Sequence, residues 1–208
     1  MTLHSGITAR DPRTGLQIRV GVMGSASNGQ DPVVGALCRT LGQTIAMRGC
    51  CLLTGACPGM PHETVLGAKL VGGHVVGISP AATLKDHVEV HGSPYREYDV
   101  LIFTGMGLMG RELMNIYSSD IVIVVGGRSG TLGEFAIAYE AGKLIGVLTG
   151  TGGITETIPQ LEASLTAKHT GAEVIYDSDA ERLVDRLLER YQSGAYTCPC
   201  QPAELQSI

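Results

Sequence analysis

The stretch that most constrains the fold is an apolar run, residues 121–125, that leads into a glycine-rich loop and then a helical pattern. Five apolar and mostly β-branched residues without polar alternation predict a buried parallel strand. The glycines of the loop, residues 126–131, allow the backbone to approach a ligand closely. The N–H groups of the following helical turn favour an anion such as phosphate. We therefore predict a phosphate-binding loop, with the carboxylate of Glu134 beside it in the first turn of the helix.

The rest of the chain repeats this alternation of strand and helix. Short apolar runs predict strands at 18–23, 50–53, 74–78, 100–103, 121–125, 144–148 and 173–176. Helical spacing of apolar residues fills most of the intervals, whereas residues 79–98 show no clear period and predict a long loop. The expected fold is α/β, a doubly wound, Rossmann-like parallel sheet of about seven strands with helices on both faces. We expect a flexible leader over residues 1–16, one nucleotide-binding domain over 17–192 and a tail over 193–208.

Glycine-rich segments follow four of the expected strands, so they meet at one edge of the sheet, where such folds bind ligands. Glycine accounts for 29 of the 208 residues. The segments after the first and second strands contain Gly24-Ser25 and Thr54-Gly55. These four residues are therefore candidates for the wall of the binding site.

Composition excludes several classes of function. The net charge of −5 and the absence of Trp argue against a nucleic-acid surface. No apolar run approaches the roughly 20 residues that span a bilayer, and residues 1–17 lack the apolar core of a signal peptide. We therefore expect a cytoplasmic protein without a membrane or nucleic-acid partner, and with reduced cysteines.

Several other short motifs are weaker evidence for function than the loop at residues 126–131. Residues 105–110 formally match the dinucleotide fingerprint G-x-G-x-x-G, but they follow the fourth strand rather than the first. Thr131 and Glu134 have the spacing of a capping box, which is a structural alternative to a catalytic Glu134. The alternating His87, Glu89 and His91 suggest solvated loop groups more than a metal site, and we expect no metal. The C-x-C pair at 198–200 could bind metal or act in redox chemistry, but it lacks the matched ligands of a metal site.

The chain resembles the LOG family of cytokinin riboside 5′-monophosphate phosphoribohydrolases, and the related molybdenum cofactor carrier proteins. The family signature P-G-G-x-G-T-x-x-E is similar to residues 125–134, with Val125 in place of proline and one extra residue between the glycine pairs. The family's catalytic arginine lies nine residues before the Asp that starts the signature strand, as Arg111 lies nine before Asp120. The similarity extends over roughly residues 18–150.

The resemblance implies two alternative functions. In the first, the protein is an N-glycosidase that releases base and ribose 5-phosphate from a nucleoside 5′-monophosphate, with Arg111 and Glu134 as catalytic residues. In the second, it is a non-catalytic carrier or sensor of a phosphorylated nucleotide or a molybdopterin-type ligand, without a required cofactor. Both place the ligand on the same residues: Gly24, Ser25, Thr54, Gly55, Gly126, Gly127, Ser129, Gly130 and Thr131. The resemblance also implies a homodimer or larger homo-oligomer.

Overall fold

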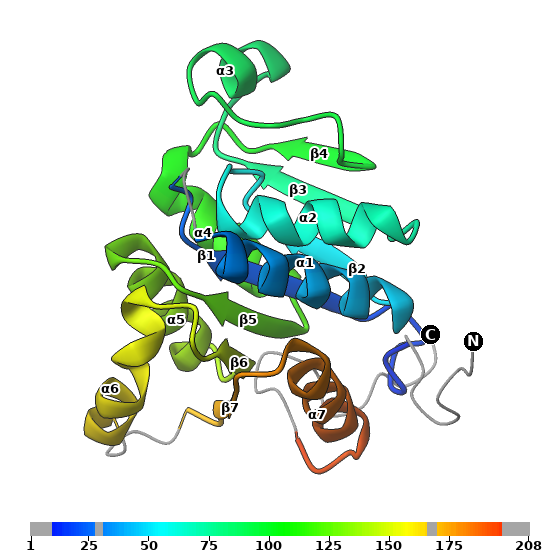
Figure 1. Ribbon diagram of the computed structural model, residues 1–208, viewed down its shortest axis with the longest axis vertical. Coiled ribbons are helices and arrows are strands. Elements are labelled where there is room, and N and C mark those ends of the chain that lie inside the picture. The colour runs from blue at the N-terminus through cyan, green and yellow to red at the C-terminus, as the bar shows by residue number, and fades with distance from the viewer. Residues whose placement is uncertain (1–9, 28–30, 166–169, 197–208) are drawn as a thin grey trace.

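The computed structural model describes residues 10–27, 31–165 and 170–196. They form seven strands with helices between them (Figure 1). The elements in order are β1 (Arg19–Gly24), α1 (Pro32–Met47), β2 (Cys51–Thr54), α2 (Met60–Leu70), β3 (Val75–Ser79), α3 (Leu84–Glu89), β4 (Val100–Phe103), α4 (Gly107–Ser118), β5 (Ile121–Val125), α5 (Ser129–Glu140), β6 (Leu144–Leu148), the 3-10 helix η1 (Gly153–Glu156), α6 (Ile158–Leu165), β7 (Glu173–Asp177) and α7 (Ala180–Gln192).

All seven strands pair in parallel in the order β4-β3-β2-β1-β5-β6-β7. The chain builds outward from β1 to the edge strand β4 and then returns to place β5 on the other side of β1. The strand order therefore reverses between β1 and β5, and loops leaving these two strands diverge there. The predicted doubly wound α/β fold is confirmed.

The sheet separates two apolar layers. Alternate residues of β5 point to opposite faces, so Ile121, Ile123 and Val125 pack in one layer while Val122 and Val124 pack in the other. The first layer contains α1, α2 and α7, and the second contains α4, α5 and α6. Because both faces are covered, the strand is apolar throughout.

The region between β3 and β4 differs from the prediction. The expected loop over 79–98 contains α3, whose N-terminus is capped by the Thr83 side chain as it accepts from the Asp86 N–H. His87 in this helix is fully buried, and its ring bonds the Ser79 hydroxyl and the Pro94 carbonyl. His87 is therefore not a solvated loop group, and the described part of the chain holds no group of three metal-ligating side chains.

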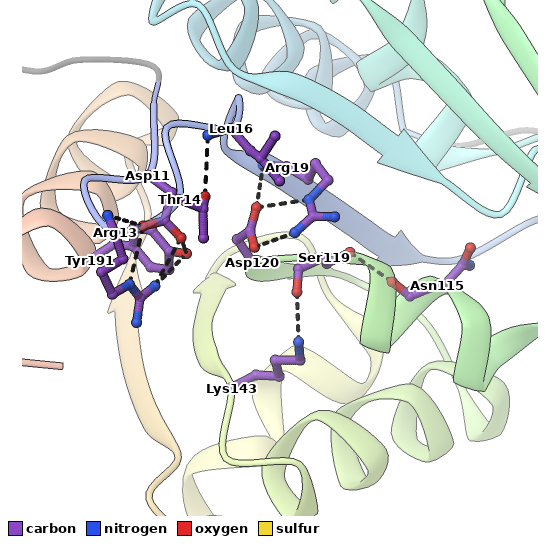
Figure 2. A network of polar contacts seen from close by, with 10 residues as sticks. All are labelled: Asp11, Arg13, Thr14, Leu16, Arg19, Asn115, Ser119, Asp120, Lys143 and Tyr191. Carbon is purple, nitrogen blue, oxygen red and sulfur yellow. Dashed lines mark hydrogen bonds and ion pairs between the residues drawn. The ribbon is translucent and has the colours of Figure 1, made fainter. Parts of the chain in front are cut away.

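Part of the expected leader is held against the last helix (Figure 2). Asp11 is buried and accepts a hydrogen bond from the Tyr191 hydroxyl of α7, and Arg13 bonds both of these residues. At the other end, the Tyr196 hydroxyl donates to the Gly142 carbonyl. Residues at both ends of the described chain are thus hydrogen-bonded to the rest of the fold, and the division into leader, domain and tail stays a prediction. The C-x-C pair at 198–200 lies outside the described residues.

The amino end of the sheet carries a buried lysine. Lys143 is 2% exposed and donates to the Ser119 carbonyl at 2.7 Å, close to the Arg19–Asp120 ion pair (Figure 2). Burial lowers the pKa of Lys143 to about 8 from its usual 10.5. Between these pH values the unfolded chain binds a proton that the folded chain does not, so stability rises with pH.

The variant Lys143→Met should remove this dependence. Between pH 8 and 10.5 the wild-type free energy of unfolding should gain about 3 kcal/mol relative to the variant, because each pKa unit corresponds to roughly 1.4 kcal/mol. Urea unfolding of both proteins across this range measures the difference. A constant difference would show that Lys143 titrates normally in the folded chain.

Candidate functional site

A cavity of about 550 Å³ opens at the carboxyl end of the sheet, where the strand order reverses between β1 and β5. Its wall comes from the ends of β1 and β2 and from α2, α4 and α5. The lining residues are Val22, Met23, Gly24, Ser25, Ala26, Ser27, Gly55, Cys57, Pro61, Leu108, Arg111, Glu112, Arg128, Ser129, Gly130, Thr131 and Glu134. The volume lies in the range of small-molecule and cofactor sites.

The N-terminus of α5 forms one end of this cavity. Ser129, Gly130 and Thr131 are its first three residues, and all of them line the cavity. Arg128 precedes the helix without making a side-chain cap, and its guanidinium donates to the hydroxyl of Ser27 in the loop after β1. The first-turn N–H groups of a helix lack intrahelical acceptors and carry partial positive charge. With Arg128 beside them, they make this end of the cavity suitable for an anion.

The glycine pair before α5 lies in the turn that connects β5 to α5. Gly126 and Gly127 have positive φ angles of 53° and 94°, and neither lines the cavity. The Gly126 N–H donates to the Thr151 hydroxyl at 2.8 Å, and a Cβ on Gly127 would lie 2.3 Å from the Thr131 hydroxyl. The structure thus gives these two glycines a place in the turn, whereas the sequence suggested direct phosphate contact.

Thr54 also lies outside the cavity wall. It is fully buried, and its hydroxyl contacts the Tyr98 hydroxyl and accepts from the Ala56 N–H. Gly24, Ser25 and Gly55, by contrast, line the cavity, and their contact with a ligand stays a prediction.

Arg111 of α4 and Glu134 of α5 face each other across the cavity wall. Arg111 Nη1 lies 3.6 Å from Glu134 Oε1, and the two side chains are 7% and 9% exposed. The Arg111 guanidinium also lies 3.6 Å from the Cys57 sulfur, while its Nε has no hydrogen-bond partner among the described residues. A Cβ on Gly55 would lie 2.0 Å from Arg111 Nη1, so Gly55 provides the space that the guanidinium fills.

One sequence interpretation of this pair is wrong. Because α5 begins at Ser129, Glu134 lies in the second turn, and Arg128 rather than Thr131 occupies the N-cap. A capping box between Thr131 and Glu134 is therefore excluded. Arg111, in α4, is buried as well.

The electrostatics of the pair favour proton exchange near neutral pH. Burial raises the pKa of Glu134 to about 7, against the opposing effect of the Arg111 cation, and the nearby Glu112 raises it further. Burial also raises the pKa of the Cys57 thiol, which Arg111 opposes. Glu134 can thus accept or donate a proton at the cavity wall, and Arg111 can bind an anion there.

The sequence prediction missed several cavity residues, namely Ser27, Cys57, Leu108, Glu112 and Arg128. Ser27 and Arg128 follow strands that meet at the reversal point, so their position was a usable signal. The segment that formally matches the dinucleotide fingerprint follows the edge strand β4, and its Gly105 and Gly107 do not line the cavity.

The fold and the cavity define a ligand-binding, Rossmann-like α/β protein. The sequence profile of the SLOG cluster4 family matches residues 17–184, and the chain belongs to that family. This supports the predicted resemblance at the level of the wider SLOG and LOG-like superfamily.

Solved structures with similar folds include two proteins linked to the molybdenum cofactor. The crystal structure of TM1055 has 26% identity and a TM-score of 0.73, over 84% of this chain and 99% of that one. The molybdenum cofactor binding protein from Rippkaea orientalis has 29% identity and a TM-score of 0.67, over 82% and 94%. The molybdenum cofactor carrier protein from Chlamydomonas reinhardtii has 29% identity and a TM-score of 0.64, over 83% and 99%.

Proposed function

We propose that the protein binds and carries a phosphorylated pterin-type ligand, such as the molybdenum cofactor, or a nucleotide. The observation that carries this proposal is the cavity where the strand order reverses between β1 and β5. One end of this cavity is the N-terminus of α5, which has no side-chain cap and lies beside Arg128. A phosphate bound there would accept hydrogen bonds from the first-turn N–H groups. The remaining cavity, lined by Met23, Leu108 and Pro61, offers apolar surface to a flat heterocycle.

The similar structures support the carrier alternative. Two proteins whose names record binding or carriage of the molybdenum cofactor share the fold over more than four fifths of this chain. In this chain, Arg111 and Arg128 would supply positive charge toward a phosphate, and no further cofactor is required. A cytoplasmic location remains our prediction; across the described residues, none of the helices has the length and apolar character to traverse a bilayer.

The test is identification of the ligand by mass spectrometry of protein purified without denaturation, followed by calorimetry with that compound. A stoichiometric pterin or nucleotide phosphate supports the proposal. The variant Arg128→Gln should weaken binding about tenfold through loss of one charge at the phosphate end. Arg39→Gln is the matched control, because Arg39 is half-exposed and does not line the cavity.

The Arg111–Glu134 pair favours a second candidate function, the hydrolysis of a nucleoside 5′-monophosphate to base and ribose 5-phosphate. Glu134 would stabilise the oxocarbenium-like ribose or orient the attacking water, and Arg111 would position the phosphate or the carboxylate. A carboxyl group with a pKa near 7 at the cavity wall is consistent with this role.

The variant Glu134→Gln separates the two functions. If the protein is a hydrolase, base release should fall at least about 100-fold while affinity for the monophosphate changes only a few-fold, because the amide keeps the shape but not the charge. Chromatographic assay of released base and calorimetry measure the two effects. Absence of base release from any monophosphate by the wild-type protein would eliminate the hydrolase.

We also propose that the chain forms a homodimer or larger homo-oligomer through α4 and the edge strand β4. Exposed apolar side chains gather on these two elements, namely Val100, Ile102, Leu108, Met109, Leu113, Met114 and Tyr117. Large exposed apolar patches are typical of protein–protein interfaces.

The double variant Met109→Glu/Leu113→Glu should convert the oligomer to monomer, because each interface would then bury unpaired carboxylates from both copies. Light scattering after size-exclusion chromatography measures the mass. Leu165→Glu, at an exposed apolar position on α6, is the control. A wild-type protein that is monomeric at micromolar concentration would contradict the proposal.

A further inference from the structure

A second carboxylate, Glu112, lies beside the anion-binding end of the cavity. It follows Arg111 in α4 and lines the cavity. A Cβ built on Gly130 would lie 3.8 Å from Glu112 Oε1, and one built on Gly133 would lie 3.5 Å from Oε2. The carboxylate of Glu112 therefore lies along the first turns of α5, in the space that side chains at these two positions would occupy.

This position matters because α5 itself has no acidic residue in its first turn. Negative charge near a helix N-terminus is favourable, and Glu112 supplies it from the neighbouring helix. A bound phosphate would compete for the same positive potential. The charged groups of the cavity wall are then two cations, Arg111 and Arg128, and two acids, Glu112 and Glu134. Burial raises the pKa of Glu112 while Arg111 opposes it, so the carboxylate is partly removed from water.

We infer that Glu112 is a specificity-determining residue that weakens binding of a doubly charged phosphate relative to a singly charged one. This inference rests on the proposed binding function. Repulsion from a fixed carboxylate doubles when the ligand's charge doubles, whereas hydrogen bonds from the α5 N–H groups are available to both ligands. Glu112 thus limits how tightly a terminal phosphate is held, and the ligand can be released from the cavity.

The test compares adenosine 5′-monophosphate, a dianion at pH 7.5, with its phosphate methyl ester, a monoanion of nearly the same shape. Affinities for both are measured by calorimetry for the wild-type protein, Glu112→Gln and the control Glu89→Gln. The control makes the same change of charge at a well-exposed carboxylate of α3. We expect Glu112→Gln to bind the dianion about tenfold more tightly and the monoanion about threefold more tightly. Glu89→Gln should match the wild type.

Unchanged or weaker binding of the dianion by Glu112→Gln would overturn the inference, and so would equal gains for both ligands. Glu112→Ala serves as a second variant, and it should give the same order of affinities if charge rather than the amide causes the effect. A protein that binds neither probe, in wild type and variants alike, would overturn the inference and would also contradict the nucleotide as the proposed ligand. Binding by the wild type without a specific effect of Glu112 would contradict this inference alone.

Discussion

Replacing Arg111 by methionine is expected to weaken binding of the phosphorylated ligand about 100-fold, because a buried cation of the cavity wall would be lost. Calorimetry with the copurified ligand measures the loss. Arg39→Met removes a half-exposed guanidinium that lies outside this cavity and should leave affinity unchanged. A loss of less than threefold in Arg111→Met would show that Arg111 does not contact the ligand.

The same variant should alter the pH dependence of stability. Burial raises the pKa of Glu134 from 4.5 to about 7 in the folded chain. The free energy of unfolding therefore falls as the pH rises from 4.5 toward 7. Without the Arg111 cation that pKa should rise further. The stability difference between wild type and Arg111→Met should therefore grow above pH 7, as urea unfolding at several pH values can measure.

Replacing Gly42 by valine is expected to lower the free energy of unfolding by about 3 kcal/mol, because α1 and α2 pack backbone against backbone. A Cβ on Gly42 would lie 1.8 Å from the Thr64 carbonyl oxygen, and one on Gly67 would lie 2.1 Å from that of Arg39. Both neighbours are backbone carbonyl oxygens, which cannot move aside as the end of a flexible side chain could. The two helices would have to separate, and urea unfolding monitored by circular dichroism measures the cost.

Gly35→Ala in the same helix is the matched control. Its Cβ would meet only the Glu63 side chain, at 3.9 Å, so the helix should gain about 0.5 kcal/mol from the change. Equal destabilisation by both substitutions would contradict the assignment of the Gly42→Val loss to the close packing of α1 against α2.

The sequence predicted the fold well because strand positions depend on local patterns. Buried runs such as 121–125 are apolar on both faces, and glycines mark the ends of several elements. The helix α3 was not predicted, because it is only six residues long and its buried His87 interrupts the apolar pattern.

The site was predicted less completely because it depends on which strand ends meet. Gly24, Ser25, Ser129 and Gly130 were expected at the cavity and lie there. The burial of Arg111 depends on the space at Gly55, which follows β2 and is distant from α4 in the chain, so spacing along the sequence does not reveal it. Cys57 and Glu112 likewise reach the cavity only through the packing of neighbouring elements.

The two layers on either side of the sheet separate the parts of the chain that can change independently. Arg111 and Glu134 stand in the α4–α5 layer, while the close contact of α1 with α2 belongs to the opposite one. Effects at such separated positions should add. A change such as Gly35→Ala can therefore raise the free energy of unfolding without altering the cavity. This added stability can offset the cost of new side chains in the cavity. The ligand preference can then diverge while the fold is retained.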